Sequence, residues 1–365
     1  MSAGHARLRG VGVATPAGTL DQEAAAAFAT VRCCADESQQ AWLHRIYKQS
    51  EVKRRASVLM DRSDDSAALE AFYPPPVSPE DRGPTTAVRL RRFALAAGPL
   101  AAKACRAAFA DAVTEPAEVS HLVTVSCTGL VSPGLDAELI RRLGLSPDIG
   151  RINLGFMGCH GALNGLRAAG ALAQSGPGAR VLLSCVELCS LHFRYGWDPQ
   201  KVVANALFAD GAGAAIVGPA DDGADGYRLI DTASRLAPDS SEAMSWQVGD
   251  HGFEMSLSRE VPRLIRGSIS AWLEGWLARH ALSVADVAHW VIHPGGPRII
   301  QTVTESLELP EVAGRASAAV LAEHGNMSSP TVLFVLSRLR AQAATGPCVV
   351  MGFGPGLALE AALLR

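Results

Sequence analysis

Two similar stretches recur in the two halves of the chain, and this internal repeat constrains the fold more than any other feature of the sequence. Residues 116–129 read PAEVSHLVTVSCTG, and residues 283–296 read SVADVAHWVIHPGG. Each combines a polar turn that carries an acid, a histidine, and an apolar strand that ends in small residues. His121 and His289 mark the same point of each stretch, 168 positions apart. The repeat predicts two similar α/β units related by a pseudo-two-fold axis.

The same step of 168 residues relates two side chains that can do chemistry. From Cys159 it ends within one residue of Asn326, and both residues precede a helix-like apolar segment. The polar segment Gly218–Tyr227 is typical of a joint between two units. We therefore expect an N-terminal unit over residues 1–220, which carries the cysteine, and a C-terminal unit over residues 221–365, which carries the asparagine.

The expected strands are almost continuously apolar. Examples are HLVTVS at 121–126, RVLLSCV at 180–186 and CVVMGF at 348–353. Such runs suit sheets that are covered by helices on both faces. The proline-rich segment 72–84, FYPPPVSPEDRGP, breaks the pattern and is predicted to be an excursion over the surface.

Composition and charge exclude several classes of protein. Apolar residues make up 48% and charged residues 19% of the 365 residues, which is typical of a globular protein. The net charge of −3 and the lack of a basic tract argue against a nucleic-acid partner. No apolar run reaches the roughly 20 residues of a membrane span, and the first residues do not resemble a secretion signal. We expect a cytoplasmic protein that neither spans a membrane nor binds nucleic acid.

The chain has eight cysteines, which the reducing cytoplasm would keep as thiols. Most are expected to fill the core, because a free cysteine behaves as a small apolar residue. Cys185, Cys189 and His192 come closest to a set of metal ligands, but their spacing matches no zinc motif. We therefore expect no metal site.

Cys159 lies in GFMGCHGALNGL, where a strand-like stretch turns into a helix of small residues. Gly158 and Gly161 permit a tight turn and a close approach of the backbone. A cysteine at a helix N-terminus is favoured as thiolate, and the adjacent N–H groups can bind an oxyanion. The alternative is a packed thiol at a tight junction. His160 is a poor base for this thiol, because neighbouring residues on a helix point about 100° apart.

Two further residues are candidates for the same site. His293 ends the apolar strand HWVIH and opens into a Gly-Pro loop, where a side chain can reach a cleft. Asn326 lies before a predicted helix start, opposite Cys159 in the internal repeat. The alternatives are a capped core histidine and an ordinary turn asparagine.

Cysteine, histidine and asparagine in this chain order have two familiar uses. One is papain-like proteolysis, but the signature around the papain cysteine is absent. The other is decarboxylative Claisen condensation, in which a thiol holds an acyl group and a second thioester loses CO2.

Four segments make the second use specific. They are GFMGCHGALNGL at 155–166, HPGGP at 293–297, GNMSSP at 325–330 and GFGPG at 352–356. In this order and spacing they resemble the landmarks of type III polyketide synthases, the chalcone-synthase-like branch of the thiolase superfamily. The similarity runs from about Trp42 to Arg365. It is closer than the similarity to ketoacyl synthase III enzymes, whose matching asparagine segment usually reads GNTS.

The resemblance implies an α/β thiolase fold of five layers, αβαβα, in a homodimer. It also implies an acyltransferase that loads an acyl-CoA starter on Cys159 and extends it with malonyl-CoA, without a carrier protein or cofactor. His293 is implied as a cation that keeps the thiolate ionised before loading, and His293 and Asn326 as donors to the enolate formed from malonyl-CoA. The product would be cyclised to a pyrone, resorcinol or other small phenolic. The alternatives are a single-condensation enzyme like ketoacyl synthase III and an inactive thiolase-fold partner subunit.

The resemblance further implies the surroundings of the three residues. Aligned with the family, the gate and cavity positions are Phe208, Met255, Cys127, Thr128, Cys189, His192, Trp246 and Ser328. Met255 replaces an aromatic residue at the second gate position, and Phe253 lies two residues away. The cyclisation loop is Gly352, Phe353, Gly354, Pro355 and Gly356.

A basic cluster at residues 44–55, HRIYKQSEVKRR, is either a solvated helix face or a contact for a phosphorylated ligand. Because the family binds CoA phosphates with basic residues in this part of the chain, Lys48 and Arg55 are predicted to bind CoA. The differences from plant chalcone synthases in the cavity argue against a chalcone-type starter pocket. The stretch GFEMSLSREVP at 252–262 resembles that of bacterial enzymes which make alkylpyrones, alkylresorcinols or small phenolics.

Overall fold

The computed structural model describes residues 6–63, 66–220 and 226–365. Its main feature is a nine-stranded mixed sheet, which consists of two parts with the same topology. The first part contains five strands, in the spatial order β1 (Ala6–Ala14), β7 (Asp210–Pro219), β6 (Val181–Leu188), β4 (His121–Ser126) and β5 (Gly150–Gly155). The second part contains four, in the order β8 (Tyr227–Leu236), β13 (Ala358–Leu364), β12 (Cys348–Gly354) and β11 (His289–Ile292).

The two parts also share their strand directions. In each, the first three strands pair antiparallel and the third pairs parallel with the fourth. Only three residue pairs, between β1 and β8, connect the parts. The repeat seen in the sequence is therefore a repeat of topology. The exception is β5, because none of the described residues forms a strand beyond β11 at the equivalent edge.

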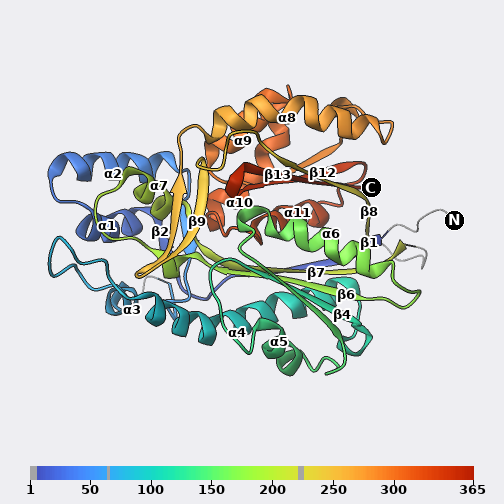
Figure 1. Ribbon diagram of the computed structural model, residues 1–365, viewed down its shortest axis with the longest axis horizontal. Coiled ribbons are helices and arrows are strands. Elements are labelled where there is room, and N and C mark those ends of the chain that lie inside the picture. Colours follow the sequence, from blue (N-terminus) through green and yellow to red (C-terminus); the bar gives the residue numbers. More distant parts are fainter. Residues whose placement is uncertain (1–5, 64–65, 221–225) are drawn as a thin grey trace.

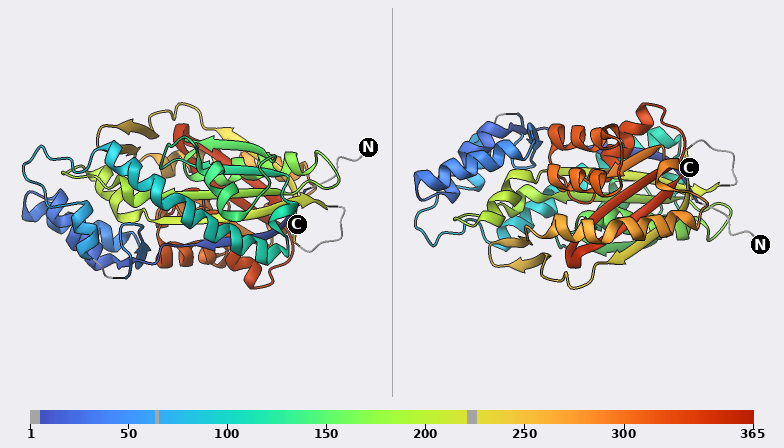
Figure 2. Two further views of the ribbon diagram at one scale, coloured as in Figure 1. Left: turned by 90° about the horizontal axis from the view of Figure 1, so that it is seen from below. Right: turned by 90° about the horizontal axis from the view of Figure 1, so that it is seen from above.

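Helices complete five layers (Figures 1 and 2). On one outer face lie α4 (Thr86–Ala112) and α5 (Leu135–Leu143), and on the other lie α8 (Val261–Ala278) and α9 (Pro297–Ser306). Between the two parts of the sheet lie α6 (Gly161–Ala173) and α11 (Thr331–Ala341), each in contact with strands of both parts. This αβαβα arrangement confirms the predicted thiolase-type architecture.

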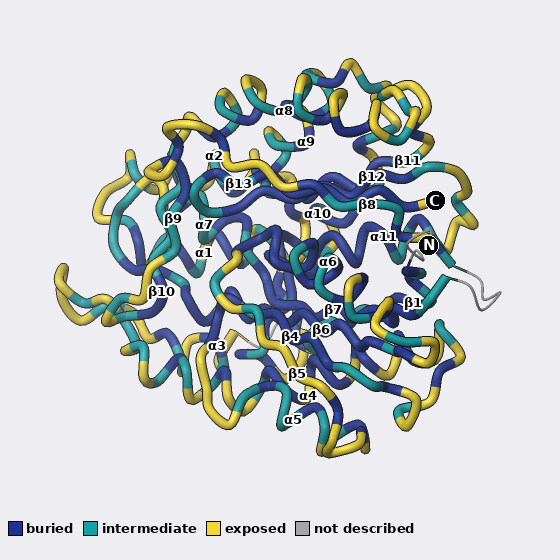
Figure 3. Tube along the Cα trace, turned by 45° about the vertical axis from the view of Figure 1, so that its right-hand side comes forward, coloured by how far each residue is buried: buried dark blue, intermediate teal, exposed yellow. Residues whose placement is uncertain are grey.

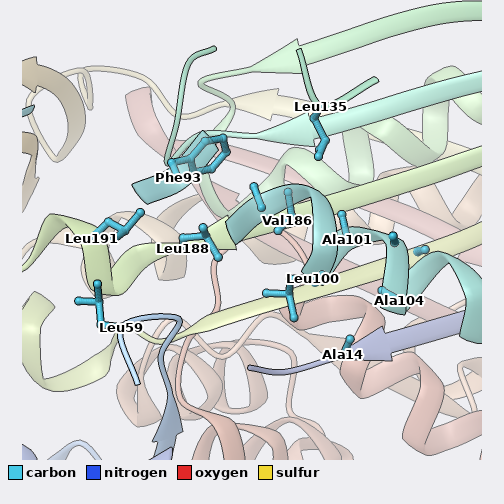
Figure 4. Packing of buried hydrophobic residues seen from close by; sticks show 14 of the residues in the cluster. Ala14, Leu59, Phe93, Leu100, Ala101, Ala104, Leu135, Val186, Leu188 and Leu191 are labelled. Atoms are coloured by element: carbon cyan, nitrogen blue, oxygen red, sulfur yellow. The ribbon is translucent and has the colours of Figure 1, made fainter. Parts of the chain in front are cut away.

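Apolar packing holds the layers together. Figure 3 shows most of the sheet and the central helices as the buried interior, and the outer helices as partly exposed; the edge strand β5 is mostly exposed. In one cluster, Phe93 and Leu100 of α4 lie with Val186 and Leu188 of β6 (Figure 4). Of the two central helices, α6 is rich in glycine and alanine, and an added Cβ at Gly165 would overlap Leu183 of β6. Small residues therefore let α6 approach the sheet closely.

The remaining elements cover one end of the layers, on the left of Figure 1. They are β2 (Thr19–Asp21), α1 (Gln22–Cys33), α2 (Glu37–Gln49), β3 (Arg54–Ala56), α3 (Ser66–Phe72), α7 (Pro199–Leu207), β9 (Met244–Gly249) and β10 (Gly252–Leu257). The other segments are α10 (Arg315–His324) and the 3-10 turns η1 (Pro116–Glu118), η2 (Gly158–His160), η3 (Cys189–His192), η5 (Val284–Asp286), η6 (Glu311–Gly314) and η7 (Pro355–Leu357).

Several local predictions can be compared with these elements. Both polar turns of the repeat form capping boxes, at Glu115 and Ser283. After α3, the proline-rich segment has no regular structure and is mostly exposed up to Pro84, apart from the buried Tyr73. The predicted joint Gly218–Tyr227 includes residues 221–225, which lie outside the described residues. Within the described ranges no helix is long and apolar enough to cross a membrane.

Candidate active site

Cys159 lies in η2, directly before α6, and its side chain is buried. The turn depends on Gly158, which has φ +70° and whose added Cβ would lie 2.5 Å from Cδ of Pro355. A side chain at position 158 is therefore excluded both by the backbone conformation and by a neighbouring ring. The sequence prediction of a cysteine at a tight strand-to-helix turn is confirmed.

Asn326 lies between α10 and α11, where its backbone pairs with the chain at Leu207–Ala209. Its Oδ1 accepts a hydrogen bond of 2.8 Å from the N–H of Ser328. This bond fixes the orientation of the amide, so that Nδ2 is the end left to donate. The side chains of Ser328 and Asn326 lie near the Cys159 thiol and favour its thiolate, which lowers its pKa. The structure therefore brings the cysteine and the asparagine together across the internal repeat.

His293 follows β11 and donates its backbone N–H to the Met351 carbonyl of β12, at 2.9 Å. The neighbouring β12 lies against the η2 turn that carries Cys159. The His293 side chain is only 1% exposed, and neither ring nitrogen has a hydrogen-bond partner among the described residues. A buried imidazole with two unpaired nitrogens is unusual and is expected where a ligand completes the site.

Burial sets the charge states of this pair. It raises the pKa of the Cys159 thiol to about 11, with a smaller contribution from the Glu187 charge, while the bonds from Ser328 and Asn326 oppose the shift. Burial also lowers the pKa of His293 to about 3, and the nearby His160 acts in the same direction. Burial therefore opposes an isolated charge on either group, and the resting His293 cation stays a prediction.

The predicted gate and cavity positions line one cavity of about 100 Å³ with Cys159. These residues are Cys127, Thr128, Cys189, His192, Phe208, Trp246, Met255 and Ser328. The loop at 352–356 reaches the same cavity through Pro355. Further lining residues that the sequence did not single out include Arg194, Lys201 and Asn205.

The hairpin β9–β10 forms one wall. Trp246 and Met255 are cross-strand partners, and the Trp246 Nε1 donates to the Cys127 carbonyl at 2.7 Å. Phe253 stacks on His192 at 4.4 Å between ring centroids. His192 donates from Nε2 to the Thr128 carbonyl and accepts at Nδ1 from the Phe253 N–H. Met255 and Phe253 both line the cavity.

Glu187, at the end of β6, is a residue that sequence reasoning missed. It is fully buried and accepts hydrogen bonds from the Cys127 N–H at 2.9 Å, Thr128 Oγ1 at 2.8 Å and Ser329 Oγ at 2.7 Å. Burial raises its pKa, and these bonds oppose the rise. A single acid inside an otherwise apolar strand was the signal available in the sequence.

The two residues predicted to bind CoA lie in different environments. Lys48 is exposed near the end of α2. Arg55 is buried and donates to the carbonyls of Asn205, Ala206 and Phe208, at the end of α7. These carbonyls occupy donors of its guanidinium group, but Arg55 also lines the cavity with Cys159, so its contact with CoA stays a prediction, as does that of Lys48.

The described residues contain no group of three or more His, Cys, Asp or Glu that could hold a metal ion. The site contains a buried thiol at the start of a central helix, with the Asn326 amide near it. The unpaired imidazole of His293 lies near His160, the residue after Cys159, and neither His293 nor Asn326 lines the cavity. On a five-layered αβαβα fold, this is the site of a condensing enzyme of the thiolase type.

Comparison with known proteins identifies the family of condensing enzymes to which the chain belongs. The family model of chalcone and stilbene synthases matches with its N-terminal domain over residues 1–221 and with its C-terminal domain over 228–365. The chain belongs to this family of type III polyketide synthases. It is therefore an acyltransferase that catalyses decarboxylative condensation of CoA thioesters.

Individual relatives and a solved structure support the same family assignment. The α-pyrone synthesis polyketide synthase-like protein Pks18 of Mycobacterium tuberculosis is 30% identical over 364 residues, 98% of this chain and 90% of the relative. The 1,3,6,8-tetrahydroxynaphthalene synthase of Streptomyces peucetius is 34% identical over 73% of this chain and 72% of its own. The crystal structure of PKS-I from the brown alga Ectocarpus siliculosus superposes with a TM-score of 0.91 at 33% identity, covering 100% and 99% of the two chains.

Proposed function

We propose that Cys159 carries the growing chain, that His293 takes the thiol proton, and that Asn326 donates to the enolate. In loading, the thiol sulfur attacks the starter thioester, its proton moves to His293, and CoA leaves as a thiol after taking that proton. The neutral imidazole suits this role, because an acceptor nitrogen must be free. Each charge forms in the presence of its counter-charge, which lessens the cost of burial.

Extension uses the same groups. Malonyl-CoA loses CO2, and the electron pair of the broken C–C bond becomes the enolate of acetyl-CoA. The oxygen of this enolate takes hydrogen bonds from Asn326 Nδ2 and from His293. The enolate carbon then attacks the Cys159 thioester and releases the thiolate. No redox partner or metal enters this balance.

We further propose a linear aliphatic starter and an α-pyrone product. The observation that carries this is the lining of the cavity, which extends from Cys159 to apolar side chains of the covering elements. These are Leu20, Ala25, Phe28, Met60 and Leu69. Pks18, the M. tuberculosis relative, is named for α-pyrone synthesis.

The test is incubation with malonyl-CoA and a panel of acetyl-, hexanoyl-, lauroyl-, palmitoyl- and benzoyl-CoA, with products identified by mass. Alkylpyrones from the aliphatic starters support the proposal. A pentaketide made from malonyl-CoA alone overturns the proposed starter. Single condensation onto an acyl carrier protein overturns the proposed repeated extension.

The proton transfer to His293 predicts a pH profile. Because the pKa of an isolated Cys159 thiol is raised to about 11, its thiolate fraction grows with pH up to that value. In His293→Gln, alkylation of Cys159 by iodoacetamide should rise roughly tenfold per pH unit between pH 7 and 10. In the wild-type protein the profile should be flatter and the rate at pH 7 higher.

Cys34 is the internal control, since burial raises its pKa to about 11 too and it does not line the cavity. Its profile should be the same in both proteins. Superposable Cys159 profiles in the two proteins would refute proton transfer to His293.

Trp246 is predicted to restrict the starter. Trp246→Gly removes the indole wall and the bond to Cys127, so benzoyl-CoA should gain at least tenfold in kcat/KM relative to hexanoyl-CoA. Lost packing against His192 and Phe253 should lower the free energy of unfolding by about 1–3 kcal/mol. Val248→Gly, at an exposed position of the same strand, controls for the added glycine and should leave the starter preference unchanged.

We also propose a homodimer formed along β5. This edge strand is mostly exposed, and Ile152 on it is 38% exposed. Leu130, Val131 and Met157 are exposed apolar residues of the adjoining loops. Sedimentation velocity should give a dimer for the wild-type chain and a monomer for Ile152→Asp. A monomeric wild type rules out this interface.

A further inference from the structure

The segment after the nucleophile and the glycine-rich loop at 352–356 fit into each other. An added Cβ at Gly354 would overlap the His160 ring at Cδ2 and lie 2.9 Å from Nε2. Gly354 has an extended backbone with φ −162°, which any residue adopts. The Met157 carbonyl oxygen would lie 3.0 Å from the same Cβ. The His160 ring, which makes the closest contact, therefore excludes a side chain at this position more strongly than the backbone does.

The fit is reciprocal. Pro355 of the loop packs against Gly158, which precedes Cys159, and a Cβ added at Gly158 would lie 2.5 Å from Cδ of Pro355. Each segment thus presents a ring to a glycine of the other. Because Gly158 directly precedes Cys159, the position of the loop and the position of the sulfur are coupled.

His160 is itself held in place. Its Nδ1 donates to Asn164 Oδ1 at 2.6 Å, one turn along α6. Asn164 Nδ2 donates to Glu360 Oε1 at 3.2 Å on β13, and Glu360 also pairs with Arg167 of α6. His160 and Glu360 are both buried. The network therefore joins α6 to the strand that follows the loop, while the ring of His160 supports the strand that precedes it.

We propose that His160 is a positioning residue, which holds the loop 352–356 against Cys159 and so fixes the cavity wall that the enzyme-bound chain meets before release. Pro355 and Gly158 line the cavity beside Cys159. This inference rests on the proposed role of Cys159. It assigns a function to a histidine that the proposed mechanism does not use.

A double-mutant cycle tests the proposal. Gly354→Ala should drive the loop from the ring and lower kcat/KM for the extended product about 10²-fold, since displacements near 1 Å have effects of this size. His160→Ala should lower kcat roughly tenfold with little change in KM for malonyl-CoA, and should raise the share of early-released, shorter products. In the double variant the overlap with the ring is gone, so kcat/KM should recover at least tenfold over Gly354→Ala.

Gly352→Ala is the matched control. Its added Cβ would lie 3.1 Å from Cα and 3.2 Å from Cβ of His160, atoms that alanine keeps. His160→Ala should therefore not rescue Gly352→Ala. If Gly354→Ala is insoluble, recovery of soluble protein in the double variant gives the same comparison.

The proposal is overturned if the fold losses in kcat/KM of Gly354→Ala and His160→Ala simply multiply in the double variant. It is also overturned by a His160→Ala protein whose melting temperature falls while its product ratio stays that of the wild type. Acylation of Cys159, followed by intact mass, separates this inference from the proposed function. Without acylation in the wild type the proposed function fails, whereas normal acylation without rescue refutes only the role of His160.

Discussion

Cys159→Ala is expected to abolish starter loading and the formation of every extended product. The sulfur is the group to which the starter is transferred, and no other side chain in the proposed mechanism can hold the acyl group. Removing the covalent step should lower the rate of condensation by at least 10³-fold, to the background of the assay. Decarboxylation of malonyl-CoA should persist at a reduced rate, because Asn326 and His293 stay in place. Intact mass, product mass and release of CO2 measure the three steps.

Cys189→Ala is the control for Cys159→Ala. Cys189 lines the same cavity with a buried thiol, whose pKa burial raises well above its ordinary value. It should still give acylated protein and extended products. Loading that survives in Cys159→Ala, or is lost equally in Cys189→Ala, would mean that Cys159 is not the acyl carrier.

Asn326→Ala should produce the second-largest loss of product formation. In contrast to Cys159→Ala, it should lose decarboxylation and keep acylation. It removes the donor that we propose for the developing enolate oxygen, and the loss of one such donor lowers rates by about 10²–10³-fold. Cys159 should still be acylated, because the thiol and His293 remain. The measurements are CO2 release and acylated mass on the same preparation.

Asn326→Ala loses the hydrogen bond between Asn326 Oδ1 and the Ser328 N–H, so the variant needs a check of its fold. Acylation of Cys159 supplies that check. Normal extension by Asn326→Ala contradicts the assigned role. Equal loss of acylation and decarboxylation indicates a general distortion of the turn instead.

The parts of the fold that were predictable are those in which a local pattern and the repeat agree. The step from Cys159 to Asn326 located the starts of both central helices, since a pseudo-two-fold places equivalent residues face to face. The strands β4 and β11 were predictable from their apolar runs and capped turns. The edge strand β5 was predictable from the strand-like stretch before Cys159, although among the described residues of the second half it has no counterpart.

The site was predictable in its residues and less so in its electrostatics. The charge state of His293 depends on how completely neighbouring layers bury it, and a linear sequence carries no measure of that burial. The same holds for Arg55, whose donors are occupied by carbonyls at the end of α7, more than a hundred residues away. The role of Glu187 could not be predicted, because its hydrogen-bond partners Cys127, Thr128 and Ser329 come together only in the folded chain.

The unequal ends of the nine-stranded sheet have a consequence for assembly. At one end β5 is mostly exposed to solvent, while at the other β11 is mostly buried and η6 packs beside it. A molecule with one open sheet end can extend its sheet only through a self-complementary contact, and such a contact closes after two copies. A dimer formed along β5, as proposed above, would therefore leave no free β5 edge for the open-ended, fibre-like growth that a sheet with two free ends permits.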